Sequence, residues 1–169
     1  FAKYSVCLNN TLFFQGTNYI TNGTYDQELW KTTGTTASTA IFADLYNGTC
    51  GSYSCSSNPA NLTVYNNKLY FTAYNPSYGT EIYVTDGTNS PSLIDIWPGV
   101  QNSSPSLLRV FRGELWFKAN NGSNGSDFMS YDGTTLTARD FVAAGGAPAM
   151  DTNFAISGNL LWFRGNLGN

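Results

Sequence analysis

The sequence contains no histidine, few charged side chains and no long apolar run. Because histidine is the commonest general base and zinc ligand, its absence excludes Ser-His-Asp and Cys-His catalysis within this chain. Only 11% of the 169 residues are charged, and the net charge is −3. Eight Lys and Arg do not make the basic footprint of a nucleic-acid-binding protein. No apolar run approaches the ~18 residues that a spanning helix needs, so we expect no membrane span.

Aromatic and small polar residues take the place of the missing charges. Aromatic side chains make up 15% of the chain, and 17 residues are glycine. Seven Asn-X-Ser/Thr sequons begin at Asn9, Asn22, Asn47, Asn61, Asn102, Asn121 and Asn124. Chance alone would give about four in such a composition. The excess, together with the predicted turns in which most of the sequons fall, predicts a secreted, N-glycosylated protein.

Only three cysteines are present, and they fall into two kinds of position. Cys50 and Cys55 flank the short stretch "GSYS", and in a secreted loop such a pair predicts a local disulfide. Cys7 aligns with the predicted core positions Val64 and Val110 of later repeats. We therefore expect Cys7 to be a buried free thiol, with a covalent link to another subunit as the alternative.

An aromatic motif recurs along the chain and reveals an internal repeat. "TLFF" begins at residue 11, "KLYF" at 68, "ELWF" at 114 and "LLWF" at 160, in steps of 57, 46 and 46 residues. A second motif follows the first three copies: "ELWKTTGT" from residue 28, "EIYVTDGT" from 81 and "DFMSYDGT" from 127. We assign one repeat domain over 1–169, with units 1–60 (carrying an insertion at 47–58), 61–106 and 107–152, and a half unit at 153–169.

Each full unit is predicted to form four short antiparallel strands. In the second unit we expect strands near 61–66, 68–73, 80–85 and 92–97, with hairpin turns at 66–67 and 86–87 rich in Asn, Asp and Gly. The runs "LYF" and "EIYV" are apolar on both faces, so these strands need cover on both sides. Stacked four-stranded blades of a β-propeller provide that cover. A β-helix and a β-sandwich are the alternatives.

The second motif resembles a known repeat. "ELWKTTGTTASTAIFADL" and "EIYVTDGTNSPSLIDIWPG" are similar to the ELWxxDGT repeat, also called hyalin-like, of large secreted and cell-surface proteins. The resemblance implies a β-propeller-like unit and implies no particular activity. Thr33 departs from the Asp of this motif, Tyr83 departs from its Trp, and the third unit matches loosely.

Three and a half units are fewer than the four to eight blades that usually close a propeller. The all-β fold is therefore predicted to be a partial or fragment propeller, belonging to a larger ring or to an open array that a neighbour completes. An unpaired sheet edge invites strand addition, so self-association follows as a physical expectation.

Carboxylates are the remaining candidates for acid–base chemistry, since the chain also lacks a glycine-rich phosphate loop. Glu28, Glu81 and Asp127 share one repeat position, and Asp86 and Asp132 share another. A catalytic pair is normally unique, so copies in successive units predict structural roles such as bonding to turn amides. Glycoside hydrolysis by a carboxylate pair and calcium binding at the Asp-Gly-Thr turns are the alternatives.

The sequence thus predicts a structural or adhesive extracellular repeat protein without catalytic residues, metal or cofactor, such as a fibril, matrix or cell-coat subunit. Its expected partners are further copies, other extracellular proteins or glycans. The alternative is a carbohydrate-binding, lectin-like propeller, because exposed rings can stack on sugars. The tyrosines in predicted loops are Tyr19, Tyr46, Tyr53, Tyr74 and Tyr78. A glycoside-processing enzyme is a more remote alternative.

Overall fold

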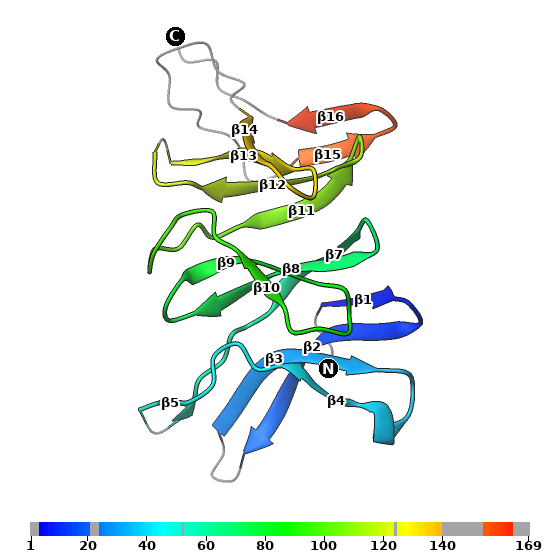
Figure 1. The fold of residues 1–169 in the computed structure, drawn as a ribbon, viewed down its shortest axis with the longest axis vertical. Coiled ribbons are helices and arrows are strands. Elements are labelled where there is room, and N and C mark those ends of the chain that lie inside the picture. The colour runs from blue at the N-terminus through cyan, green and yellow to red at the C-terminus, as the bar shows by residue number, and fades with distance from the viewer. Residues whose placement is uncertain (1–3, 21–23, 52, 124, 140–153, 164–169) are drawn as a thin grey trace.

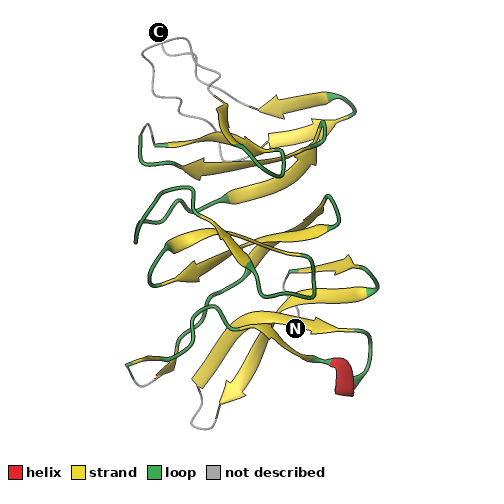
Figure 2. Ribbon diagram, viewed as in Figure 1, coloured by secondary structure: helices red, strands yellow, loops and turns green. Residues whose placement is uncertain are grey.

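Antiparallel strands make up nearly all of the regular structure (Figure 2). The structure is a computed structural model that describes residues 4–20, 24–51, 53–123, 125–139 and 154–163. Within these ranges the only helix is a single 3-10 turn, η1 (Thr36–Ser38), so no helix there is long enough to cross a membrane. The predicted all-β class is confirmed.

The described strands form three four-stranded sheets and two small hairpins (Figure 1). Sheet one contains β1 (Ser5–Leu8), β2 (Thr11–Ile20), β3 (Thr24–Thr32) and β4 (Ala40–Ala43). Sheet two contains β7 (Ala60–Tyr65), β8 (Lys68–Asn75), β9 (Gly79–Thr85) and β10 (Ser92–Ile94). Sheet three contains β11 (Ser106–Phe111), β12 (Glu114–Asn120), β13 (Ser126–Tyr131) and β14 (Leu136–Arg139). The hairpins are β5 (Thr49–Cys50) with β6 (Tyr53–Ser54), and β15 (Phe154–Ser157) with β16 (Leu160–Phe163).

Each sheet is a meander in which consecutive strands pair, and each matches one predicted repeat unit, with sheets two and three beginning one residue before the predicted boundary. The predicted strands of the second unit match β7 to β10 to within three residues at each end. The predicted hairpin turns between the first and second strands are also confirmed. In sheet two, for example, Asn66 and Asn67 have φ values of 47° and 55°, the left-handed conformation that tight hairpins require.

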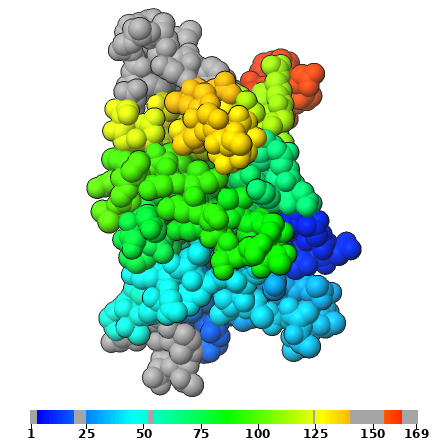
Figure 3. Space-filling view, viewed as in Figure 1, coloured from blue at the N-terminus to red at the C-terminus, as the bar shows by residue number. Residues whose placement is uncertain are grey.

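The sheets stack face to face, and two apolar clusters fill the space between them. Phe13 and Leu29 of sheet one pack with Phe71 of sheet two in the first cluster. Tyr70 of sheet two and Phe117 of sheet three belong to the second cluster. The middle strands β8 and β9 are therefore covered on both faces, which confirms the interpretation of the "LYF" and "EIYV" runs. Figure 3 shows the three units as successive bands of one continuous body.

The stacking also brings the first strands of the sheets together. β1 lies against β7, and β7 lies against β11, although about 50 residues separate each pair along the chain. These strands form one edge of their sheets, so their side chains are less completely covered than those of the middle strands. This edge carries the candidate site.

Candidate functional site

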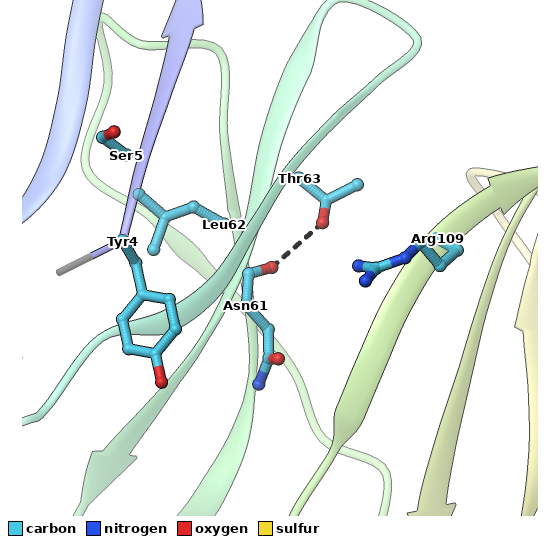
Figure 4. A pocket seen from close by; sticks show the side chains of 6 residues that line it. All are labelled: Tyr4, Ser5, Asn61, Leu62, Thr63 and Arg109. Atoms are coloured by element: carbon cyan, nitrogen blue, oxygen red, sulfur yellow. Dashed lines mark hydrogen bonds between the residues drawn. The ribbon is translucent and has the colours of Figure 1, made fainter. Parts of the chain in front are cut away.

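A polar cleft opens along the edge formed by the first strands of the three sheets (Figure 4). Its volume is about 430 Å³, within the range of small-ligand sites. The lining residues come from all three sheets: Tyr4, Ser5, Asn61, Leu62, Thr63 and Arg109. None of them is acidic. The cleft exists only because the sheets stack, since no two neighbouring sheets supply the whole lining.

Two backbone bulges shape the cleft. The pairing of β7 with β8 shifts register between Ala60 and Thr63, and that of β11 with β12 shifts between Ser106 and Arg109, 46 residues later. Inside these bulges Asn61 has φ 54° and Leu107 has φ 61°. A bulge turns a side chain away from the regular alternation of the strand. The repeat therefore builds the same backbone feature twice, with different side chains on it.

Hydrogen bonds hold the Asn61 amide and the Thr63 hydroxyl in fixed positions. Asn61 Nδ2 donates to Thr72 Oγ1 at 3.2 Å and to the Pro105 carbonyl at 3.5 Å. Thr63 Oγ1 donates to the Asn61 carbonyl at 3.0 Å, the bond drawn in Figure 4. The floor of the cleft is thus fixed by sheet two and by the chain that enters sheet three.

Arg109 supplies the positive charge of the cleft. Its guanidinium extends from β11 toward Asn61, while Tyr4 lies on the opposite side of Asn61 (Figure 4). Nη1 donates to the Leu108 carbonyl at 2.9 Å, which uses one of the five N–H donors of the guanidinium. Arg139 is paired with Glu114, whereas Arg109 forms no ion pair with a carboxylate in the part of the chain that the structure describes.

The repeated glutamates lie elsewhere and have structural partners. Glu28 and Glu81 are fully buried. Glu81 Oε1 accepts a bond from the Ser103 amide at 2.9 Å, and Oε2 accepts from the Ile96 amide at 2.9 Å and the Ser103 hydroxyl at 2.6 Å. Each glutamate therefore ties its sheet to the segment that leads to the next sheet. The predicted bonding of these carboxylates to backbone amides is confirmed.

Glu28 makes the same contacts in sheet one. Its carboxylate accepts bonds from the amides of Leu45 at 3.0 Å and Ser57 at 2.6 Å, and from the Ser57 hydroxyl. Burial raises the pKa of Glu28 to about 7, although these bonds oppose the shift. Burial raises the pKa of Glu81 as well. The position marked by Glu in the second motif is therefore a connection between successive sheets.

The aspartates of the Asp-Gly-Thr turns organise those turns. Asp86 Oδ1 accepts the amides of Thr88 and Asn89, each at 2.8 Å, and these bonds lower the pKa of Asp86 to about 2. Asp132 makes equivalent bonds in sheet three, which lower its pKa. Within the described ranges no three His, Cys, Asp or Glu side chains converge as metal ligands.

One face of sheet one is less covered than its counterparts in the later sheets. Leu12 is 38% exposed there, whereas the equivalent Leu69 and Leu115 are fully buried against the preceding sheet. The same face carries Phe14 and Trp30, both half-buried, with ring centroids 6.4 Å apart. We call this the first-sheet face and define it by Cys7, Leu12, Phe14 and Trp30.

The disulfide prediction is confirmed, and Cys7 is a free thiol as predicted, but its predicted burial is wrong. Cys50 and Cys55 are joined within the insertion that carries β5 and β6. Cys7 is a free but exposed thiol. It lies on the first-sheet face, where no described sheet packs, and on an edge strand. The equivalent Val64 is half-buried and packs against the first cluster, whereas Val110 is exposed, so this repeat position is covered in sheet two and uncovered in sheet three.

The sequons occupy different environments. Asn9, Asn47 and Asn102 are exposed and Asn121 is half-buried, while Asn22 and Asn124 lie outside the described residues. Asn61 lies inside β7 rather than in a turn and lines the cleft. Glycosylation of all seven stays a prediction.

Of the five tyrosines predicted to lie in loops, only Tyr46 and Tyr78 do; the other three lie in strands β2, β6 and β8. Tyr19 stacks edge to face on Tyr25 at the end of the long β2–β3 hairpin, with centroids 4.9 Å apart, and both rings are largely exposed. Tyr46 and Tyr74 lie 5.4 Å apart and are half-buried. Tyr78 is exposed, and the side chain of Tyr53 lies outside the description. None of these rings lines the cleft.

Sequence reasoning missed the cleft residues Tyr4, Asn61 as a lining residue, and Arg109. One signal could have found Arg109: the equivalent residues in the other units are Val6, Thr63 and Ala155, all uncharged. A charge at one copy of a repeated position marks a local specialisation. In comparisons with known proteins, no family model matches the chain, and no curated protein is significantly similar to it.

Proposed function

We propose that this chain is a structural or adhesive extracellular glycoprotein whose units stack as β-propeller-like blades and whose copies associate head to tail. The ELWxxDGT-like motifs and the seven sequons support the extracellular assignment. The disulfide between Cys50 and Cys55 suits an oxidising compartment. A repeat in which each sheet needs a neighbour to cover it is suited to assembly.

The incomplete cover of the first-sheet face carries this proposal. Sheets two and three each bury the corresponding face against the sheet before them, through Leu69 and Phe71 in sheet two and Leu115 and Phe117 in sheet three. Sheet one repeats this arrangement with Leu12 and Phe14. The two interfaces within the chain therefore define the matching occupant: the opposite face of a sheet of the same kind.

The fourth unit offers such a face. Trp162 on β16 is 59% exposed. It occupies the repeat position of Phe13, Tyr70 and Trp116, all of which are buried: Phe13 and Tyr70 between sheets, and Trp116 against Phe111 and Arg139. We therefore assign the occupant as a second copy, with Trp162 of one copy on the first-sheet face of the next. Because the two contacting surfaces differ, the contact is heterologous and produces a closed ring or an open filament.

Two variants test this arrangement. Leu12→Lys places a charge on the first-sheet face, and Trp162→Lys places one on the surface of the fourth unit. Each variant alone lacks one of the two contacting surfaces, so each should be monomeric in sedimentation velocity. A mixture retains one intact surface of each kind and should form dimers that grow no further. Val100→Lys is the control, since Val100 is exposed and lies between β10 and β11, outside both sheet one and β16. Wild-type protein that stays monomeric, or variants that assemble as wild type does, would contradict the proposal.

The polar cleft favours carbohydrate binding as the second candidate function. It contains a tyrosine, an amide, hydroxyl groups and a guanidinium, the groups that recognise sugars through stacking and directed hydrogen bonds. Binding of soluble saccharides by protein that does not self-associate would favour this candidate over the structural one.

A further inference from the structure

We propose that the cleft between the first strands binds a saccharide that carries a carboxylate, such as a sialic acid or a uronic acid. This inference deepens the carbohydrate-binding alternative and does not depend on self-association. The juxtaposition that carries it is Tyr4, which directly precedes β1, with Asn61 from sheet two and Arg109 from sheet three around one cleft.

The first argument is charge. Arg109 is exposed, donates one bond to a backbone carbonyl, and forms no ion pair with a described carboxylate. The other five lining residues are uncharged, so the cleft presents a guanidinium without an acidic counterpart. The planar fork of N–H donors in a guanidinium matches the two oxygens of a carboxylate. An anionic group on the ligand follows from this arrangement.

The second argument is the neutral part of the lining. A tyrosine ring offers a flat surface on which the C–H groups of a sugar ring can pack. The Asn61 amide and the Thr63 hydroxyl are fixed by their own hydrogen bonds, so binding would not have to order them. A bare inorganic anion would use Arg109 but would leave the rest of the cleft unfilled.

The third argument is that the arginine occurs in only one unit of the repeat. The bulges recur after 46 residues, so the frame belongs to the repeat, whereas the residue at the position of Arg109 changes from unit to unit. Val6, Thr63 and Ala155 could not supply a charge. A single copy of a functional group on a repeated frame is typical of a binding site and differs from the copied glutamates, which have structural partners.

Glycan occupancy of the sequon at Asn61 is a direct test of the proposal. A glycan on Asn61 would start inside the cleft and fill it. Asn61 Nδ2, the atom that would be glycosylated, points to Thr72 and Pro105 in the structure. This proposal therefore departs from the sequence prediction at this one sequon: we expect glycopeptide mass spectrometry of the secreted protein to find Asn61 unoccupied, whatever the occupancy of the other six. Full occupancy of Asn61 would overturn the proposal.

Binding is tested by titrating the full chain with 3′-sialyllactose, with a glucuronic-acid disaccharide and with lactose, using calorimetry or saturation-transfer NMR. We expect at least one acidic saccharide to bind about ten-fold more tightly than lactose, and its affinity to fall with added salt. Binding of sialyllactose alone or of the glucuronide alone would support the proposal and identify the source. Equal binding of lactose, or no binding of any probe, would overturn it.

Substitution of the arginine separates the site from general charge effects. Arg109→Gln should weaken binding of the acidic saccharide about ten-fold and leave lactose unaffected. Arg112→Gln is the matched control, because Arg112 is also exposed but lies in the β11–β12 turn outside the cleft. Thermal melting verifies that both variants fold. Sedimentation of the same samples reports self-association separately, so a failure of either proposal can be told from a failure of the other.

Discussion

Replacing Glu81 tests whether the glutamate of the second motif holds successive sheets together. Its carboxylate accepts three hydrogen bonds, two from the backbone amides of Ile96 and Ser103 and one from the Ser103 hydroxyl. In Glu81→Ala the hydroxyl can still donate to the Thr80 carbonyl, 3.1 Å away. The two amides lose their acceptors, and each buried unsatisfied group costs about 1–3 kcal/mol. We therefore expect the free energy of unfolding to fall by about 2–6 kcal/mol.

Glu81→Gln is the more informative change, because it keeps the size of the side chain and one oxygen. The side-chain NH2 of the glutamine replaces one of the two carboxylate oxygens, each of which accepts a hydrogen bond from a backbone amide. Because an NH2 group cannot accept that bond, one backbone N–H is left without an acceptor. The expected loss of unfolding free energy is about 1–3 kcal/mol, measured by guanidinium denaturation followed by circular dichroism and tryptophan fluorescence.

Glu114→Gln is the matched control for this prediction. Glu114 pairs with Arg139 at 2.7 Å on the surface, where an ion pair contributes about 0–1 kcal/mol. If Glu81→Gln destabilised the protein no more than Glu114→Gln does, the buried carboxylate would not connect the sheets in the way proposed here.

Three further predictions concern pH and turn geometry. Burial raises the pKa of Glu28 from 4.5 to about 7, so the folded state binds the proton of this carboxyl more tightly than the unfolded state does. The free energy of unfolding should therefore fall as pH rises from about 4.5 to about 7. Glu28→Gln should flatten this pH dependence, measured by denaturation curves. The pKa of Asp132 is instead lowered from 3.8 in the folded state, so its carboxylate stabilises the fold above that pH, and the stabilisation is lost as pH falls. Asp132→Ala should therefore lower the melting temperature at pH 7 and have less effect near pH 2. Gly79→Ala would place a Cβ 2.0 Å from the Gln101 carbonyl oxygen at φ +71° and should cost about 2–5 kcal/mol by denaturant unfolding, whereas Gly99→Ala, which meets only open space, should cost about 1–2 kcal/mol.

The structure also explains how the first unit forms its turn without the aspartate that the second and third units have. In the first unit Thr33 replaces the turn aspartate, and the following segment forms η1 instead of an Asp-capped turn. Thr35 and Ser38 close a capping box there, with the Ser38 amide donating to Thr35 Oγ1 at 3.2 Å. Hydroxyl groups therefore do what the carboxylates of Asp86 and Asp132 do in the later units.

The sequence by itself determined the strands, the turns and the repeat of this protein. These features depend on local chemistry: Asn and Gly accept the positive φ of tight hairpins, and apolar runs such as "LYF" need cover on both faces. The same local pattern occurs in each unit, so repetition along the chain strengthened the prediction. The disulfide was predictable for the same reason, since Cys50 and Cys55 are near neighbours in sequence.

Only the tertiary structure decided which surfaces are covered and which side chains meet. Cys7 occupies the same repeat position as Val64, yet it is exposed because no described sheet packs on its face. The cleft joins Tyr4, Asn61 and Arg109, whose spacing along the chain carries no signal of contact. Its bulges depend on how neighbouring strands pair, and Asn61 and Leu107 adopt them without sharing a residue type. The burial of a sheet face and the meeting of side chains in the cleft both depend on how the sheets stack, so the sequence of a single unit does not reveal them.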